Sequence, residues 1–434
     1  MQTSWGNYPK VNHADVIELN WRDETIPFQN SNHSFLAYAQ GRSYGDSCLN
    51  ENGILITTKR LNRLIDFDAK NGILECEAGI TLASILDFIL PHSWFLPVLP
   101  GTKFVSVGGA IANDVHGKNH HRAGTFGRHL LSFELLRSNG ERLICSPDEN
   151  AELYQATIGG LGLTGIILSA KIKLKPITST LLNVEHIKFQ NLDEFFVLAS
   201  ASEQKFEYTV AWLDCVADGK NFGRGVFMRA NHVESTVSDI VLNKKSSGLK
   251  VPCYFPGLAL NRCSVKAFNN IYFKRQASKT QSQRVYYDKF FFPLDAIADW
   301  NKIYGKKGFV QYQCVIPEIN ARHIQEVLKA IVTEGQASFL SVLKTFGSVV
   351  SPGMLSFPMQ GVTLALDLPY RGASTHTLLN NLDSIVMQYG GRVYMAKDAN
   401  MSASAFKTYF PGWEQFAKYI DPKFSSSFWR RVAI

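Results

Sequence analysis

The sequence predicts an α+β fold in two parts, a mixed first domain rich in β-hairpins and a second domain with an antiparallel sheet flanked by helices. A chain of 434 residues is too long for one simple core. Residues 1–178 hold short strand patterns separated by turns, with hairpin signals at Asn71-Gly72 and Asn139-Gly140. After Pro176, longer strand patterns alternate with helical ones, which is typical of an antiparallel sheet covered by helices on one face.

The composition is that of a globular protein with an excess of positive charge. Charged residues make up 19% of the chain and hydrophobic residues 45%, which excludes a largely disordered chain. The net charge of +8 favours an acidic substrate, a phosphate-bearing cofactor or an anionic membrane surface. Neither zinc-finger spacing nor a helix rich in lysine and arginine is present, so the charge does not indicate a nucleic-acid partner.

The seven cysteines are scattered, and no C-x-x-C pair occurs. This pattern indicates neither a zinc site nor a disulfide framework and favours a reducing compartment. The first residues, MQTSWGNYPK, lack the basic and apolar regions of a secretory signal, and no apolar run approaches the roughly 18 residues of a membrane span. We therefore expect a cytoplasmic protein that contacts a membrane only peripherally.

In the first domain, strand patterns occur at residues 35–41, 53–58, 64–68 and 73–79. A helix follows, capped by Thr81 and ended by Pro91, with apolar residues at helical spacing between them. A strand at 95–99 then leads into a glycine-rich stretch. The domain is completed by a hairpin at 133–146, a helix at 149–157 and a half-buried strand at 168–174.

The second domain, 179–390, is predicted from longer strand patterns at 207–215, 223–230, 284–292, 309–317, 338–347 and 361–369, with helices at 321–334 and 375–389. Its aromatic-rich strands either line a pocket or contribute to the core. The last segment, 391–434, is predicted to hold a strand and two helices that pack back onto the first domain.

One part of the second domain is strongly basic. Residues 244–284 carry nine lysines and arginines and no acidic residue, and they include VPCYFPGLAL, an apolar run broken by two prolines. We expect a mobile loop here. It is either simply solvated or, because it combines basic and aromatic residues, able to rest on an anionic membrane or grip a phosphate.

The stretch 97–121, PVLPGTKFVSVGGAIANDVHGKNHH, is the strongest candidate for a binding site. A turn at Pro100-Gly101 precedes a short helix through Gly108-Gly109, and a polar cluster follows. Glycines let a ligand approach the backbone closely, so the pattern indicates a site for a large flat cofactor. The alternative is a glycine-rich loop with a solvated basic tail. The histidines beside Lys118 make a poor cation site, so we expect no metal.

Two further glycine motifs bear on the cofactor. Residues 160–165, GLGLTG, fit the dinucleotide pattern G-x-G-x-x-G, but a helix precedes them and a strand follows, which disfavours a nicotinamide site. They more simply allow a turn into a strand beside the cofactor. Residues 39–46, AQGRSYGD, form a strand-to-turn loop whose amides can bind a pyrophosphate. Together with 97–121, this loop suits a long dinucleotide. Serine hydrolase, zincin and P-loop motifs are absent.

Five stretches together resemble the vanillyl-alcohol-oxidase flavoprotein superfamily, which has a two-part PCMH-type FAD-binding domain, and within it the decaprenylphosphoryl-β-D-ribose oxidase family. They are AQGRSYGD, LPVLPGTKFVSVGGAIANDVHGKNHH, FGRHLLSFELL, ATIGGLGLTGIILSAKI and GGRVYMAKD. The resemblance covers nearly the whole chain. It implies an FAD-dependent oxidoreductase that converts the 2′-OH of a polyprenylphosphoryl-ribose to a ketone. A separate short-chain NAD(P)-dependent reductase would then complete an epimerisation for arabinose biosynthesis in the cell envelope.

The resemblance also assigns residues. It implies that FAD contacts Gly41, Arg42, Ser43, Tyr44, Gly45, Gly101, Ser106, Val107, Gly108, Gly109, Asn113, Asp114, Val115, His116, Ile167 and Tyr394. Lys397 matches the family's essential lysine, and His116 and Tyr44 match further catalytic positions. The implied substrate-binding positions are Lys118, Gln313, Lys344, Phe291 and Ala365. Superfamily members with covalent FAD often carry a histidine in the first loop; Ser43 and Tyr44 stand there in this chain, so we expect non-covalent FAD.

Four positions depart from the mycobacterial members of the family. Ala365 replaces a cysteine that faces the flavin, Val362-Thr363 replaces a Trp-Asn pair, and Phe291 replaces a pocket tyrosine. A cysteine-directed inhibitor should therefore not trap this protein. Two alternatives stay open at this point: an alditol or aldonolactone oxidase acting on a free sugar, and a flavin-binding scaffold without turnover.

Overall fold

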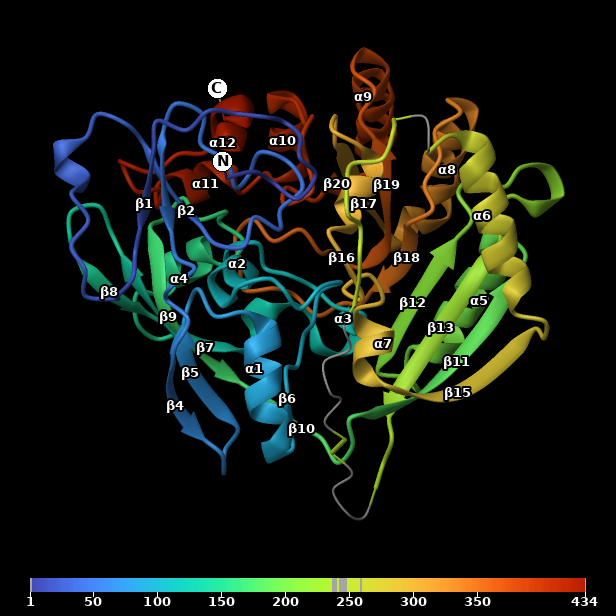
Figure 1. The fold of residues 1–434 in the computed structure, drawn as a ribbon, viewed down its shortest axis with the longest axis horizontal. Coiled ribbons are helices and arrows are strands. Elements are labelled where there is room, and N and C mark those ends of the chain that lie inside the picture. Colours follow the sequence, from blue (N-terminus) through green and yellow to red (C-terminus); the bar gives the residue numbers. More distant parts are fainter. Residues whose placement is uncertain (1, 236–239, 242–247, 258–259, 434) are drawn as a thin grey trace.

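The computed structural model describes residues 2–235, 240–241, 248–257 and 260–433. Two smaller sheets and one large sheet organise the chain. Figure 1 shows the two smaller sheets in the blue to green N-terminal part and the large sheet in the green to orange part, side by side. The red C-terminal helices lie over the N-terminal part, near both chain ends.

The N-terminal part contains a parallel sheet and an antiparallel sheet. The parallel sheet has the order β1 (Asp15–Glu18), β3 (Ile54–Thr57) and β2 (Phe35–Tyr38). The antiparallel sheet has the order β4 (Leu64–Asp68), β5 (Ile73–Glu77), β9 (Ile166–Lys173), β7 (Leu130–Leu136) and β8 (Arg142–Cys145). Both predicted hairpins are confirmed, and Gly72 and Gly140 adopt the positive φ that their turns need.

Two short helices of this part begin at side-chain caps. Thr81 accepts a hydrogen bond from the Ser84 amide before α1 (Leu82–Ile89), as predicted, and Ser106 accepts one from the Gly109 amide before α2 (Val107–Ala112). The predicted helix at 149–157 is α4 (Ala151–Thr157). The predicted strand at 95–99 is shorter, because only β6 (Trp94–Phe95) pairs with another strand.

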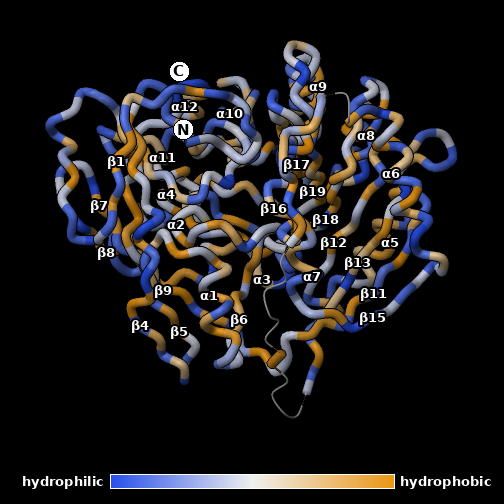
Figure 2. Tube along the Cα trace, in the orientation of Figure 1, coloured by the Kyte–Doolittle hydropathy of each residue, from blue (hydrophilic) through white to orange (hydrophobic). Residues whose placement is uncertain are grey.

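The large sheet has eight antiparallel strands. Their order is β15 (Thr280–Tyr286), β11 (Leu181–Phe189), β13 (Gly225–His232), β12 (Tyr208–Leu213), β18 (Ser341–Phe346), β19 (Gly361–Pro369), β17 (Phe309–Pro317) and β20 (Arg392–Val393). Helices α5 (Leu192–Ser202), α8 (Ile324–Thr333) and α9 (Ala373–Gln388) pack on the face turned away from the N-terminal part. Figure 2 shows that the strands are mainly apolar and the peripheral loops mainly hydrophilic.

The expectation of a loop at 244–284 is wrong for its described residues. They include β14 (Leu249–Lys250), α6 (Arg262–Arg275) and most of β15, while 244–247 and 258–259 lie outside the described residues. Asn261 caps α6, and Val265, Asn269 and Phe273 recur every four residues to form its buried face. The predicted strand at 284–292 also ends early, since α7 (Tyr287–Phe291) begins within it.

The last segment returns to the N-terminal part. After β20 it forms α10 (Ala403–Tyr409) and α11 (Trp413–Ala417), as predicted, and then α12 (Ser427–Val432), which the sequence reading missed. The Phe35 amide donates to the Lys423 carbonyl at 2.7 Å, so this segment extends the parallel sheet of the N-terminal part. Within the described ranges, we find no helix of the length and apolarity needed to cross a membrane.

Candidate active site

A cavity of about 330 Å³ lies between the loops of the N-terminal part and the large sheet. Most of the residues implied by the resemblance line it. They are Gly41, Arg42, Ser43, Tyr44, Gly101, Ser106, Gly108, Gly109, Asn113, Val115, His116, Ile167, Gln313, Lys344, Ala365, Tyr394 and Lys397. These residues come both from the N-terminal loops, which form the first wall of the cavity, and from the large sheet, which forms the second.

Glycines let the first wall come close to its neighbours and to a ligand. Gly41 has a φ of +61°, and a Cβ there would lie 2.1 Å from the Tyr38 hydroxyl oxygen. A Cβ at Gly101 would meet no atom within 4 Å, so the turn exposes bare backbone to the cavity. Gly162 and Gly165, from the misordered dinucleotide pattern, also line the cavity just before β9. Such a backbone cradle suits a large planar cofactor.

Arg42 supplies a cation to the same wall. Its guanidinium lies 4.1 Å from the centroid of the Trp5 ring, and its buried Nε has no hydrogen-bond partner among the described residues. Burial lowers the pKa of Arg42, while Asp295 opposes that shift. A cationic group with an unsatisfied donor beside a glycine cradle fits the diphosphate of FAD.

The second wall is one face of the large sheet. In the ladder between β17 and β19, Gln313 is opposite Ala365 and Gln311 is opposite Asp367; on the other side of β19, Val342 of β18 is opposite Ala365. These residues line the cavity, whereas the residues between them, such as Tyr312, enter the core. The cavity face of these strands is thus polar or small, and their aromatic residues largely serve the core.

Lys397 projects into the cavity from the turn that follows β20. Its Nζ lies 3.8 Å from the centroid of the Tyr44 ring, a cation–π geometry. Burial lowers the pKa of Lys397 to about 7, with Lys344 acting in the same direction and Asp367 opposing it. The ammonium is therefore poorly solvated and faces one nearby carboxylate.

Asp367 is that carboxylate. It accepts a hydrogen bond from Gln311 Nε2 at 2.5 Å. Burial raises the pKa of Asp367 to about 7, while Gln311 and Lys397 oppose the shift. Because each of the two charges favours the ionised form of the other, Asp367 and Lys397 titrate as a coupled pair.

His116 is buried where cofactor wall and sheet meet. Its Nε2 lies 2.9 Å from Gln313 Nε2, and its Nδ1 has no hydrogen-bond partner among the described residues. Burial, with the nearby Lys344, holds the pKa of His116 well below its usual range, so the ring is neutral at pH 7. The amide group of Gln313 therefore donates to Nε2, which places the imidazole proton on Nδ1. The rings of Phe346 and Tyr394 fix this orientation at centroid distances of 4.9 and 5.3 Å.

Five residues implied by the resemblance do not line the cavity: Gly45, Val107, Asp114, Lys118 and Phe291. The Asp114 carboxylate accepts hydrogen bonds from Ser351 Oγ, Ser356 Oγ and the Gly127 amide instead. Lys118 Nζ donates to the Phe291 carbonyl at 2.8 Å, and the Phe291 ring packs on Tyr208 behind the wall. Val107 enters the core, and Gly45 packs against the Asp398 carbonyl.

The sequence reading missed several cavity residues, among them Trp5, Asp295, Trp300, Gln311 and Asp367. Two had a usable signal, since Gln311 and Asp367 lie two positions along a strand from Gln313 and Ala365 and so share their face. The other three have no local signal, because distant segments bring them to the cavity.

The described part of the chain contains no cluster of three or more histidine, cysteine, aspartate or glutamate residues able to hold a metal ion.

Comparison with known proteins agrees with this geometry. Residues 27–146, which include both glycine-rich loops of the cavity, match the family described as FAD binding domain. The chain is also 28% identical to Delta(24)-sterol reductase of Homo sapiens. This match covers 26% of this chain and 22% of the reductase. The cavity, its donors and the match of residues 27–146 to the FAD binding domain together define an FAD-dependent oxidoreductase.

Among the relatives, two that match over most of the chain are informative. The chain is 34% identical to decaprenylphosphoryl-β-D-ribose oxidase of Mycolicibacterium smegmatis, over 96% of this chain and 93% of that protein. It is 32% identical to an uncharacterized protein of Streptomyces coelicolor, over 82% of this chain and the full length of that protein. The chain therefore belongs to the decaprenylphosphoryl-β-D-ribose oxidase family.

Proposed function

We propose that this protein oxidises the 2′-OH of a polyprenylphosphoryl-β-D-ribose to a ketone, as the first half of an epimerisation. The observation that carries the proposal is the arrangement of Lys397 in the cavity. Its poorly solvated ammonium lies between the loop that would hold FAD and the polar face of the large sheet. The full-length relative from Mycolicibacterium smegmatis is named for this lipid-linked ribose.

In this proposal the protein positions the carbinol and balances charge. Gly41, Arg42 and the backbone near Gly101 would hold FAD, which would supply the acceptor for the hydride of the carbinol carbon. The hydroxyl proton would leave to solvent separately from the hydride. Lys397 would stabilise the negative charge on the substrate oxygen and on the reduced flavin, as a fixed cation in a poorly solvated site does. Tyr44 orients Lys397 through its ring face.

The substrate would lie against the sheet. We propose that Lys344 attracts the phosphate of the lipid-linked sugar, because it lines the cavity and no acidic residue is paired with it in the described structure. Burial lowers the pKa of Lys344 to about 8, so an anionic partner would favour its charged form. Gln313 and His116 would present polar groups to the sugar hydroxyls, and Ala365 would leave space beside them.

Anaerobic bleaching of the yellow protein tests this function. Polyprenylphosphoryl ribose should reduce the flavin, and a short-chain reductase with NAD(P)H should then convert the keto product to the epimer. Lys397→Ala should retain FAD but slow bleaching roughly 100-fold or more, because it removes the charge-stabilising group. Lys418→Ala, a lysine exposed outside the cavity, is the matched control.

Other outcomes would indicate a different function or would exclude the role of Lys397. Bleaching by a free alditol but not by the lipid-linked ribose would make the protein a free-sugar oxidase. A flavin that no candidate substrate reduces would indicate a binding scaffold. Near-normal bleaching of Lys397→Ala would remove Lys397 from the chemistry.

We also propose that FAD is held without a covalent bond. Ser43 and Tyr44 line the cavity at the first loop, and neither side chain is the histidine that often forms the flavin link in the superfamily. Unfolding in acid should release all the yellow colour through a filter that retains the protein. Colour left on the polypeptide would show a covalent link.

For a lipid-linked substrate, a peripheral membrane contact on the cytoplasmic side fits the surface of α6. This helix forms an outer edge of the large-sheet part in Figure 1. Phe268 and Ile271, one turn apart, are 47% and 71% exposed, and the exposed Lys274 and Arg275 flank them. Exposed apolar side chains beside basic ones suit an anionic lipid surface.

Vesicle sedimentation tests this contact. The protein should sediment with vesicles containing anionic lipid, less at high salt, and not with neutral vesicles, since each basic residue near the surface contributes about 1 kcal/mol. Phe268→Ser with Ile271→Ser should reduce sedimentation several-fold. Ile319→Ser, which removes an exposed apolar side chain of another segment, should not. Equal sedimentation of both variants would exclude α6 as the contact.

A further inference from the structure

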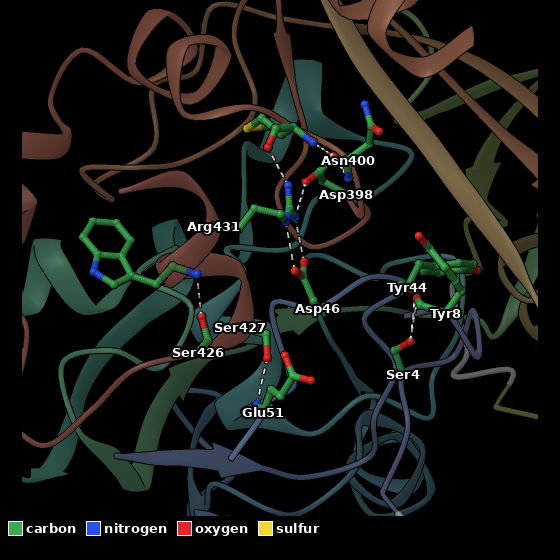
Figure 3. A network of polar contacts seen from close by, with 12 residues as sticks. Ser4, Tyr8, Tyr44, Asp46, Glu51, Asp398, Asn400, Ser426, Ser427 and Arg431 are labelled. Atoms are coloured by element: carbon green, nitrogen blue, oxygen red, sulfur yellow. Dashed lines mark hydrogen bonds and ion pairs between the residues drawn. The ribbon is translucent and has the colours of Figure 1, made fainter. Parts of the chain in front are cut away.

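Near its C-terminus, the chain joins two carboxylates of the active-site region through one arginine. Arg431, on α12, donates two hydrogen bonds to Asp46, at 2.7 and 3.0 Å, and one to Asp398 at 2.8 Å. It also donates to the Met401 carbonyl at 2.5 Å. Figure 3 shows the Arg431 guanidinium between the two carboxylates. Both are buried, with 7% and 5% of their side chains exposed.

The two carboxylates belong to the two chain segments that build the reaction centre. Asp46 ends the glycine loop 39–46 and lies two residues after Tyr44. Asp398 directly follows Lys397. Arg431 itself does not line the cavity, so any effect on the reaction must pass through these segments.

The same two segments already touch through their backbones. The Tyr44 amide donates to the Ala396 carbonyl at 3.0 Å, and a Cβ at Gly45 would lie 1.6 Å from the Asp398 carbonyl oxygen. The first segment carries the Tyr44 ring and the second carries Lys397. The Lys397 ammonium lies 3.8 Å from the centroid of the Tyr44 ring. A small shift between the segments would therefore move Lys397 relative to Tyr44.

Hydrogen bonds hold α12, the helix that carries Arg431, against the chain that follows the glycine loop. The Ser427 amide donates to the Leu49 carbonyl at 2.8 Å, and Ser427 Oγ accepts from the Glu51 amide at 2.9 Å. Ser426 Oγ caps the helix by accepting from the Trp429 amide. The helix is thus attached to the chain just after the glycine loop, and Arg431 reaches from it to Asp398.

We propose that Arg431 is a positioning residue for the oxidation, which fixes the Lys397 segment against the FAD-binding loop. The proposal rests on the proposed role of Lys397 in that reaction. A planar guanidinium contacts both carboxylates at once, whereas a lysine ammonium lacks the rigid fork needed to pair bidentately with one and still reach the other. Arginine at this position is therefore required for geometry as well as for charge.

Amide hydrogen exchange on the FAD-loaded protein tests whether Arg431 holds the two segments together. The experiment needs no substrate. Arg431→Gln should raise amide exchange several-fold in residues 41–49 and 394–402 and leave other segments unchanged. Arg431→Lys should raise it in the same two segments, because it keeps only the charge. Arg430→Gln is the matched control, since Arg430 contacts Asn50 and Glu51 and neither Asp46 nor Asp398.

The midpoint potential of the bound flavin tests the connection to Lys397. A displaced ammonium stabilises reduced flavin less, so Arg431→Gln should give a more negative potential. In a Lys397→Met background, Arg431→Gln should cause little further change, because the group it positions is gone. Asp398→Asn, a milder change that removes one carboxylate, should act in the same direction in case Arg431→Gln does not fold.

The outcomes separate this proposal from the proposed function. Unchanged exchange in both segments, or an equal fall in potential with and without Lys397, would overturn the role of Arg431. Increased exchange throughout the protein would also overturn it, because this would show a general stabilising role. If the proposed substrate fails to bleach the wild-type flavin while the segment-specific exchange is seen, the fault lies with the proposed function and not with this contact.

Discussion

The hydrogen bond from the Tyr44 amide to the Ala396 carbonyl is the contact on which the site depends. It joins the glycine loop of the N-terminal part to the turn that carries Lys397. Gly45 allows the two backbones to meet, because any side chain there would collide with Asp398. The glycine loop and the Lys397 segment are thereby held together, although more than 350 positions separate them in the chain.

The cavity holds several buried cations. Burial lowers the pKa of Lys344 to about 8 and that of Lys397 to about 7, and burial also lowers the pKa of Arg42. Asp367 is the carboxylate that opposes the shift of Lys397. A cavity in which poorly solvated cations outnumber their partners favours anionic ligands, since an anion replaces the lost solvation of each cation. A diphosphate cofactor and a phosphate-bearing sugar both meet that requirement.

How much the sequence predicts depends on whether a signal is local. Hairpin turns, the helix cap at Thr81 and the glycine loops are local, and the structure confirms them. Asp367 was within reach, because its spacing from Ala365 places both on one strand face. Arg431 and Asp46 lie 385 residues apart, so nothing in either segment signals their contact. The expectation of a loop at 244–284 is wrong for the described residues, because a basic composition does not prevent a helix that has a cap at Asn261 and a buried face.

We propose that Lys397 acts as an ammonium whose charged form Asp367 stabilises. The most direct test is the pH dependence of anaerobic flavin reduction in the wild-type protein and in Asp367→Asn. Because the charged form is active in this account, the rate should fall as pH rises through the pKa of Lys397. The fall should begin at lower pH in Asp367→Asn, since loss of the carboxylate lowers that pKa further. A rate that rises with pH, or the same midpoint in both proteins, would contradict the account.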